Sequence, residues 1–308
     1  MRPDNVTMRS STLKHHRPRL SIGGSLATVA TLLACVPLLA GCGGAGSGLT
    51  VPQVAPAKVF SLGAFQPSAP VRPGQPVTVS FTVRQPSGQP LTRYKTGSGP
   101  HTGVHLIIVR DDLAYIIHQH PPVGPDGLLR QTVTFPAPGP YKVLVDVYPN
   151  LPGVQPNFQL FTTVHVAGTY RPQSLPPFKA RLDVDGYNFQ MQGRPSLHAI
   201  QAQFVHVDVT DAHAKRPTFV SWFGALAHAI FFREGSLDYF HTHICAPDAP
   251  NCGALPGVAS SRIAGTSAAP GKLTIGVLLP APGTWRLFLQ MKLAGRIVTA
   301  PYTLQVGS

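Results

Sequence analysis

Residues 135–147 read FPAPGPYKVLVDV, and residues 279–291 read LPAPGTWRLFLQM. Both stretches contain a Pro-Ala-Pro-Gly turn, an aromatic residue two positions after the glycine, and then a strand-like segment. An aromatic ring at this place is typical of the aromatic corner of β-sandwiches, where the ring packs across a connection. The match predicts that the chain contains two related β halves.

Strand signals occur in both halves. Apolar and polar residues alternate at 77–83 and at 204–209, as expected for strands that bury one face. Asp185 and Gly186 separate two short alternating segments and predict a tight hairpin. The 33 prolines and 30 glycines interrupt the chain so often that no sustained helical period remains. We therefore predict an all-β fold of two tandem immunoglobulin- or cupredoxin-like β-sandwiches, each with about seven strands.

The N-terminal 41 residues have the order of a secretory signal. Basic residues come first, an apolar segment follows at about residues 20–40, and small residues precede Cys42. The ending LAGC at 39–42 resembles the bacterial lipobox, which implies cleavage before Cys42 and acylation of its thiol, for example by palmitate. The alternative is an uncleaved transmembrane helix, which Pro37 and the small-residue ending make the weaker interpretation.

The segments after Cys42 predict a protein stationed at a membrane surface. Residues 43–58 are rich in Gly, Ala and Pro without an apolar period, which indicates a flexible tether. No later segment has the eighteen or so consecutive apolar residues that a membrane-spanning helix needs. We expect the chain to lie on the extracytoplasmic face of the cell membrane, held by the lipid. The predicted segments are a signal peptide (1–41), a lipidated tether (42–58), a first β-sandwich (59–168), a Pro-rich linker (169–178) and a second β-sandwich (179–308).

The charge of the chain limits its partners. The formal net charge of +13 falls to about +9 when residues 1–41, with five basic residues and one acidic residue, are removed. The remaining Lys and Arg residues are scattered without a Lys/Arg run, so no nucleic-acid partner is expected. The expected partners are the membrane, through the lipid anchor, a metal ion, and an envelope protein that the sequence does not identify.

Two of the four cysteines remain for the body of the chain. Cys35 leaves with the signal and Cys42 takes the lipid, so Cys245 and Cys252 stay as a pair. In an oxidising compartment such a pair predicts a disulfide that closes a short loop. The alternative is that Cys245, two residues after His243, is a thiolate metal ligand.

A histidine repeat is the main site signal. The segments 105–120 and 228–243 align without gaps, with five of sixteen positions identical, and three of these five are histidines. The same spacing is therefore kept in two diverged copies: a histidine, a second one thirteen positions later, and a third two positions after that. The predicted metal ligands are His105, His118 and His120 in the first half and His228, His241 and His243 in the second.

Hairpin geometry explains why these histidines should meet. With a two-residue turn in each copy, His105 faces His118 and His228 faces His241; with a turn two residues longer, the first histidine faces the last one instead. Three imidazoles with a vacant position suit Cu²⁺ or Zn²⁺. The competing interpretation is structural, because histidines beside an apolar face often bond to backbone and cap a core. His101 is close enough in sequence to be a fourth ligand.

The two histidine segments resemble a group of uncharacterised exported actinobacterial proteins with tandem β domains. The resemblance covers about residues 70–308 and rests on 105–113 running into His118-x-His120-Pro121, and on 223–228 running through 233–235 into His241-x-His243. It implies a loose similarity to periplasmic copper-handling β-sandwiches. Ile244 and Cys245 stand where the group usually continues with proline, which leaves the retention of the second site open.

We therefore expect a membrane-anchored extracytoplasmic lipoprotein that binds copper or zinc through its histidine trios. The alternative is a non-catalytic envelope module that binds another protein and uses its histidines structurally. An enzyme is not expected. The chain has 12 acidic residues, and it has no nucleophile elbow, phosphate loop or His-Glu-x-x-His helix.

Overall fold

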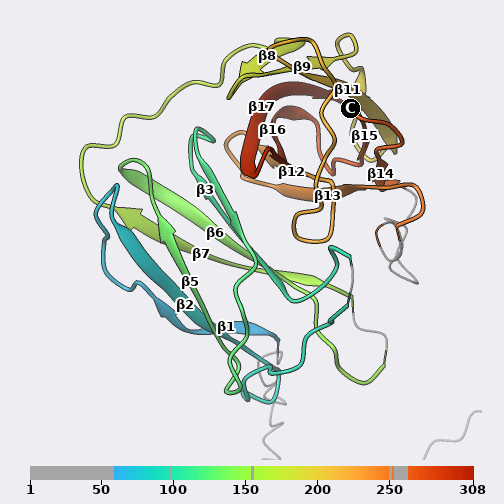
Figure 1. Ribbon diagram of the computed structural model, residues 1–308. Coiled ribbons are helices and arrows are strands. Elements are labelled where there is room, and N and C mark those ends of the chain that lie inside the picture. The colour runs from blue at the N-terminus through green and yellow to red at the C-terminus, as the bar shows by residue number, and fades with distance from the viewer. Residues whose placement is uncertain (1–58, 98, 154–155, 250–251, 253–262) are drawn as a thin grey trace, which may run out of the picture. The chain divides into compact units, whose positions relative to one another are not determined.

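The computed structural model describes residues 59–97, 99–153, 156–249, 252 and 263–308. The predicted signal peptide, the lipid on Cys42 and the tether at 42–58 lie outside these residues. The described chain belongs to one compact unit, Pro56–Ser308, and is built from β-strands without an α-helix, so the predicted all-β class is confirmed (Figure 1). Among these residues, no helix of the length and apolarity needed to span a membrane occurs.

The N-terminal half is a sandwich of two antiparallel sheets. One sheet has three strands in the order β1-β2-β5, and the other has four in the order β4-β3-β6-β7. Seven strands agree with the number expected from the sequence. Their bounds are β1 (Ser61–Gln66), β2 (Pro76–Arg84), β3 (Val104–Arg110), β4 (Ile116–Gln119), β5 (Leu128–Thr134), β6 (Gly139–Val147) and β7 (Phe158–Val166).

The core of this half follows the alternation of its strands. Val79, Phe81 and Val83 of β2 are all fully buried, and the residues between them are partly exposed. They pack against Leu106 and Ile108 of β3 in one apolar cluster. Each large side chain buried in this way contributes about 1.5–3 kcal/mol relative to exposure, which holds the two sheets together.

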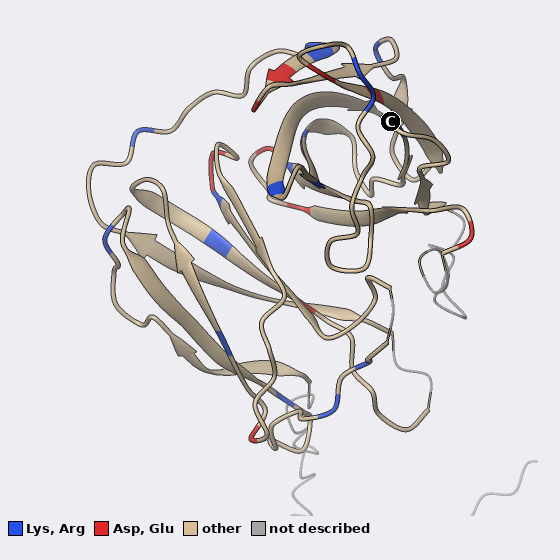
Figure 2. Cartoon of the chain, in the orientation of Figure 1, with Lys and Arg blue, Asp and Glu red and all other residues tan. Residues whose placement is uncertain are grey.

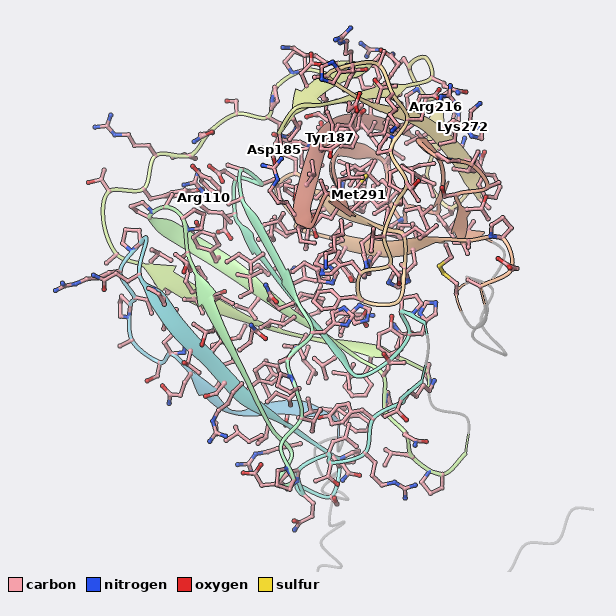
Figure 3. The ribbon with its side chains drawn as sticks, viewed as in Figure 1. Arg110, Asp185, Tyr187, Arg216, Lys272 and Met291 are labelled. Atoms are coloured by element: carbon pink, nitrogen blue, oxygen red, sulfur yellow. A yellow bond between two sulfur atoms is a disulfide. The ribbon has the colours of Figure 1, made fainter. Side chains whose placement is uncertain are left out.

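The C-terminal half forms one continuous sheet of ten strands. Their order is β10-β17-β16-β12-β13-β14-β15-β11-β9-β8, and Figure 1 shows that the sheet curls so that its inner face encloses a core. Met291, labelled in Figure 3, points into this core. The bounds are β8 (Arg181–Val184), β9 (Tyr187–Met191), β10 (Leu197–His198), β11 (Gln203–Asp211), β12 (Ala227–Arg233), β13 (Tyr239–Cys245), β14 (Gly265–Thr266), β15 (Lys272–Val277), β16 (Gly283–Leu293) and β17 (Arg296–Gly307).

The predicted aromatic corners are present in both halves. Tyr141 Oη donates a hydrogen bond to the carbonyl of Ala137 at 3.0 Å, and Trp285 Nε1 donates to the carbonyl of Ala281 at the same distance. Both rings are fully buried. The two halves therefore repeat the same local structure, as the Pro-Ala-Pro-Gly stretches predicted.

The predicted hairpin at residues 185–186 also forms. Val184 pairs with Tyr187, and Asp185 and Gly186 have φ angles of 51° and 83°. Two positive φ values at the centre of a two-residue loop define the turn that matches the twist of the flanking strands. The predicted linker lies between β7 and β8, in a segment without strands, and its bounds at 169–178 stay a prediction.

A third apolar cluster joins residues of the two halves. It contains Ile107 and Val109 of β3 together with Ile230 and Phe232 of β12, and all four side chains are fully buried. Lys142 Nζ adds a hydrogen bond of 3.0 Å to the carbonyl of Leu237. The outward faces of the two histidine hairpins are therefore packed against each other rather than exposed to solvent.

The basic side chains of the described chain are spread over both halves. Figure 2 shows Lys and Arg positions scattered along the described ribbon of both halves. Their distribution agrees with the absence of Lys/Arg runs in the sequence.

Candidate metal centre

The strands of the two histidine hairpins pair in the same way, and in both hairpins the turn is longer than two residues. Ile107 pairs with His118 in the first half, and His228 pairs with His243 in the second. Both turns thus contain four residues, at 111–114 and 234–237. Of the two turn lengths that the sequence left open, the longer one is observed.

A repeated arginine explains the longer turns. Arg110, labelled in Figure 3, donates two hydrogen bonds to the Asp112 carboxylate, at 2.8 and 2.7 Å. Its guanidinium also lies over the ring of Tyr115, 4.6 Å from the centroid. In the second half, Arg233 forms an ion pair with Asp238 at 3.4 Å. These arginines brace the turns and take no part in the histidine site.

The strand alternation sends all six repeated histidines to one boundary. On β3, Leu106 and Ile108 enter the core of the first half, so His105 faces the other way, beside Ile107. On β12, Ala227 and Ala229 enter the core of the second half, which turns His228 outward in the same manner. The histidines therefore lie on the same strand faces as the apolar cluster between the halves, next to it along the strands.

The six histidines form one pooled cluster instead of two separate trios. Three groups of three bring a ring nitrogen from each member within 4.8 Å of the others. The first-half trio is one of these groups, but the second-half trio is not. The groups are His105, His118 and His120; His105, His241 and His243; and His118, His228 and His241.

His105 and His228 are held in equivalent orientations by backbone carbonyls. His105 Nε2 lies 2.8 Å from the carbonyl of Pro100, and His228 Nε2 lies 2.9 Å from the carbonyl of Trp222. A carbonyl oxygen only accepts, so each Nε2 carries the proton and each Nδ1 keeps a free lone pair. This is the arrangement by which proteins orient a metal-binding imidazole.

The ring of His241 lies between these two lone pairs. Its Nδ1 is 3.5 Å from His105 Nδ1, and its Nε2 is 3.3 Å from His228 Nδ1. A neutral imidazole has one N–H, so only one of the two contacts is a hydrogen bond and the other places two lone pairs against each other. A metal ion resolves such a contact, because two nitrogens on a tetrahedral ion with bonds of 2.0–2.1 Å are about 3.3 Å apart.

Several ring nitrogens of the cluster are buried without a hydrogen-bond partner. Both nitrogens of His118 are in this state, and so are Nε2 of His120, Nε2 of His243 and Nδ1 of His101. Buried polar atoms are nearly always paired, since an unpaired one costs about 1–3 kcal/mol. The donor set fits a transition metal, because imidazole nitrogens are preferred ligands of copper and zinc.

Burial keeps these imidazoles neutral. It lowers the pKa of His105 and of His228 to about 3, in spite of their carbonyl partners. Burial first, and then the neighbouring histidines, hold the pKa values of His118, His241 and His243 well below the ordinary value. Neutral imidazole is the form that binds a metal, so no imidazolium of the cluster has to lose a proton before a first ion binds.

Trp222 and Phe223 cover the cluster, a role that no sequence motif indicated. They begin a tight turn in which Phe223 and Gly224 have φ angles of 49° and 80°. A positive φ is strained for a phenylalanine, and such strain is concentrated at functional sites. The turn stacks Phe223 on His120, with ring centroids 3.9 Å apart and planes 7° apart.

A buried carboxylate and a tyrosine lie behind the cluster. Asp146 accepts hydrogen bonds from Asn157, Gln159 and Tyr148, and burial raises its pKa even though these bonds favour the charged form. The Tyr148 ring contacts the ring of His105, with centroids 4.9 Å apart. Asp146 faces His105 across the β3–β6 ladder, a pairing that no sequence pattern indicated.

The other predicted site residues fall outside the coordinating groups. His101 contacts the ring of His243, with centroids 4.8 Å apart, and its Nε2 donates to the carbonyl of Cys252. The structure joins Cys245 and Cys252 by a disulfide, with Cα atoms 6.1 Å apart, so Cys245 has no free thiolate. The remaining histidines of the body, His165, His198, His206 and His213, belong to none of the three groups.

The chain belongs to a family of domains of unknown function, DUF8832, whose model matches residues 64–155 and 182–308. The two matched segments correspond to the two β halves. No curated protein matches the chain in sequence.

Distant similarities to solved structures were also found. Invasin, a bacterial integrin-binding protein, is 15% identical with a TM-score of 0.21, and the match covers 80% of this chain and 38% of invasin. A putative membrane anchored protein from Corynebacterium diphtheriae is 9% identical with a TM-score of 0.24, covering 82% and 59%. Domains 4 and 5 of the S-layer protein SbsC are 13% identical with a TM-score of 0.20, covering 81% and 98%. TM-scores this low carry no argument about a shared fold or function.

Proposed function

We propose that this chain is a membrane-anchored, extracytoplasmic metal-binding protein that holds copper or zinc at the boundary between its two β halves. The lipid on Cys42 provides the anchor, and His105, His118, His120, His228, His241 and His243 provide the ligand set. The role is one of binding and not of catalysis.

One observation carries this proposal: His118 is almost completely buried, and neither of its ring nitrogens has a partner. A histidine that only caps a core bonds to backbone with at least one nitrogen, which is what the structural interpretation requires. His118 instead lies among His120, His228 and His241, whose rings are 4.9–5.5 Å away. His118 therefore has an unpartnered nitrogen close to other imidazoles that could bind the same metal ion.

Metal titration of the full chain tests the proposal. The protein, purified in detergent and stripped with a chelator, is titrated separately with Cu²⁺ and Zn²⁺ by calorimetry. We expect binding tighter than about 10 µM, which corresponds to roughly 7 kcal/mol of binding free energy. The double variant His118→Ala, His120→Ala is expected to lose this binding.

The matched control is the double variant His165→Ala, His213→Ala, which removes two exposed histidines outside the cluster. It should bind as the wild type does. Equal binding by wild type and the His118, His120 variant, or no binding by the wild type, would refute the proposal. In that case a non-catalytic interaction module with structural histidines is the function to test next.

A further inference from the structure

Each ring nitrogen of His241 lies close to a ring nitrogen of another histidine. Nδ1 points to the lone pair on His105 Nδ1, and Nε2 points to the lone pair on His228 Nδ1. Both of these partners are fixed by backbone carbonyls and cannot turn a proton toward His241 without losing that bond. A single ion between His241 and His105 would not account for the close approach of His241 Nε2 to His228 Nδ1 on the other side of the ring.

Two of the three coordinating groups contain His241, and they share no other residue. One group contains His105 and His243, the other contains His118 and His228, and His241 is the single member that they share. Each group has a further buried nitrogen without a partner, on His243 and on His118 respectively. Each side of the His241 ring thus has two further imidazoles, which together with His241 make the three found in open copper and zinc sites.

We propose that the cluster binds two divalent transition-metal ions and that the imidazolate ring of His241 bridges them. This inference rests on the proposed metal-binding function and goes beyond it in the number of ions and their coupling. The second ion takes the place of the His241 N–H proton, which is released to solvent. With bonds of about 2.0 Å on either side of one ring, the ions are about 6 Å apart.

The competing arrangement is a single ion on the first-half trio. That ion uses His105 and His118 together, so it removes one ligand from each of the two groups that meet at His241. The number of bound ions and their magnetic coupling distinguish the two arrangements. Cu²⁺ is the probe, because each ion carries one unpaired electron and an imidazolate bridge pairs the two spins.

The experiment loads the full chain in detergent with Cu²⁺ and measures bound copper by elemental analysis and the spins by electron paramagnetic resonance. We expect two copper ions per chain. The signal per copper should fall by more than half between one and two equivalents at low temperature, and filling the second position with Zn²⁺ should prevent that fall. His213→Ala, an exposed histidine variant, is the matched control and should give the same result.

The bridge has its own variant. His241→Gln replaces the imidazole by a carboxamide that cannot link two ions as an imidazolate ring does, so it should abolish the spin coupling and reduce bound copper to at most one tightly held ion. One copper per chain in the wild type, two copper ions with independent signals, or coupling that persists in His241→Gln would each overturn the two-ion inference. The first two of these outcomes leave the proposed function standing, whereas no bound copper or zinc overturns both. If His241→Gln does not fold, the wild-type copper count and spin signal decide the matter.

Discussion

Replacing His118 by leucine should make the metal-free protein more stable while it weakens metal binding. A neutral imidazole has one donor and one acceptor, and at His118 both are buried and unpaired. Leucine is apolar and similar in size, so it removes two unpaired groups that cost about 1–3 kcal/mol each. A residue that serves the fold alone would show the opposite sign.

The contacts that leucine loses reduce this gain. The His118 ring lies 5.3 Å from the Trp222 ring and 5.6 Å from the Phe223 ring, both edge-on. Such pairs contribute about 0.5–1.5 kcal/mol each. The net stabilisation is then about 1–3 kcal/mol, which raises the melting temperature by about 2–12 °C in a chain of this size.

Thermal unfolding with and without metal measures both effects. A ligand present at 100 times its Kd stabilises the native state by about 2.7 kcal/mol, so Zn²⁺ should raise the melting temperature of the wild type. His118→Leu should start higher and gain much less from Zn²⁺, while His213→Leu should behave as the wild type. A lower metal-free melting temperature together with an undiminished Zn²⁺ effect would refute the reasoning.

The remaining predictions concern acid, the aromatic corner and the disulfide. The folded-state pKa values of His105 and His228 lie near 3, below the ordinary value of 6.5, so the unfolded chain binds more protons than the folded chain between these two pH values. The stability of the metal-free protein should therefore fall as the pH drops below about 6.5. Denaturant titrations should show a loss of about 2 kcal/mol per histidine between pH 7 and pH 5. A flat profile over this range would contradict their burial as neutral rings. Tyr141→Phe removes one partly buried hydrogen bond and should cost about 0.5–1.5 kcal/mol in the same assay, with metal affinity unchanged by calorimetry. Cys252→Ser removes the disulfide with Cys245 and should lower the free energy of unfolding by about 2 kcal/mol. Reduction of the wild type should have the same effect, and neither change should matter if the two sulfurs were not bonded.

The β architecture was largely predictable because its signals are local. Alternation over 77–83 sets which face of a strand is buried, and two positive-φ positions at Asp185 and Gly186 make a hairpin with little help from the rest of the chain. The aromatic corners are local as well, since Tyr141 bonds to a carbonyl only four residues away. The continuous ten-stranded sheet was not predicted, because it depends on pairing between strands that are distant in sequence.

The hairpin register was predicted only as one of two alternatives. Strand periodicity is unchanged when a turn grows by two residues, so the same side chains stay on the same face in both cases. The choice depends on Arg110 and Asp112, whose side-chain bonds hold the longer turn. Those hydrogen bonds form only in the folded turn, and the alternation of apolar and polar residues does not reveal them.

By itself, the sequence determined which histidines point the same way, since spacing along a strand sets the face. It also determined the two related halves, through stretches that fold locally in the same manner. Only the tertiary structure decided that both trios share one boundary, that His241 lies between His105 and His228, and that Phe223 covers the cluster. The physical reason is that these contacts join residues more than a hundred positions apart, or depend on carbonyls and turns that orient a ring, and packing between the halves fixes them.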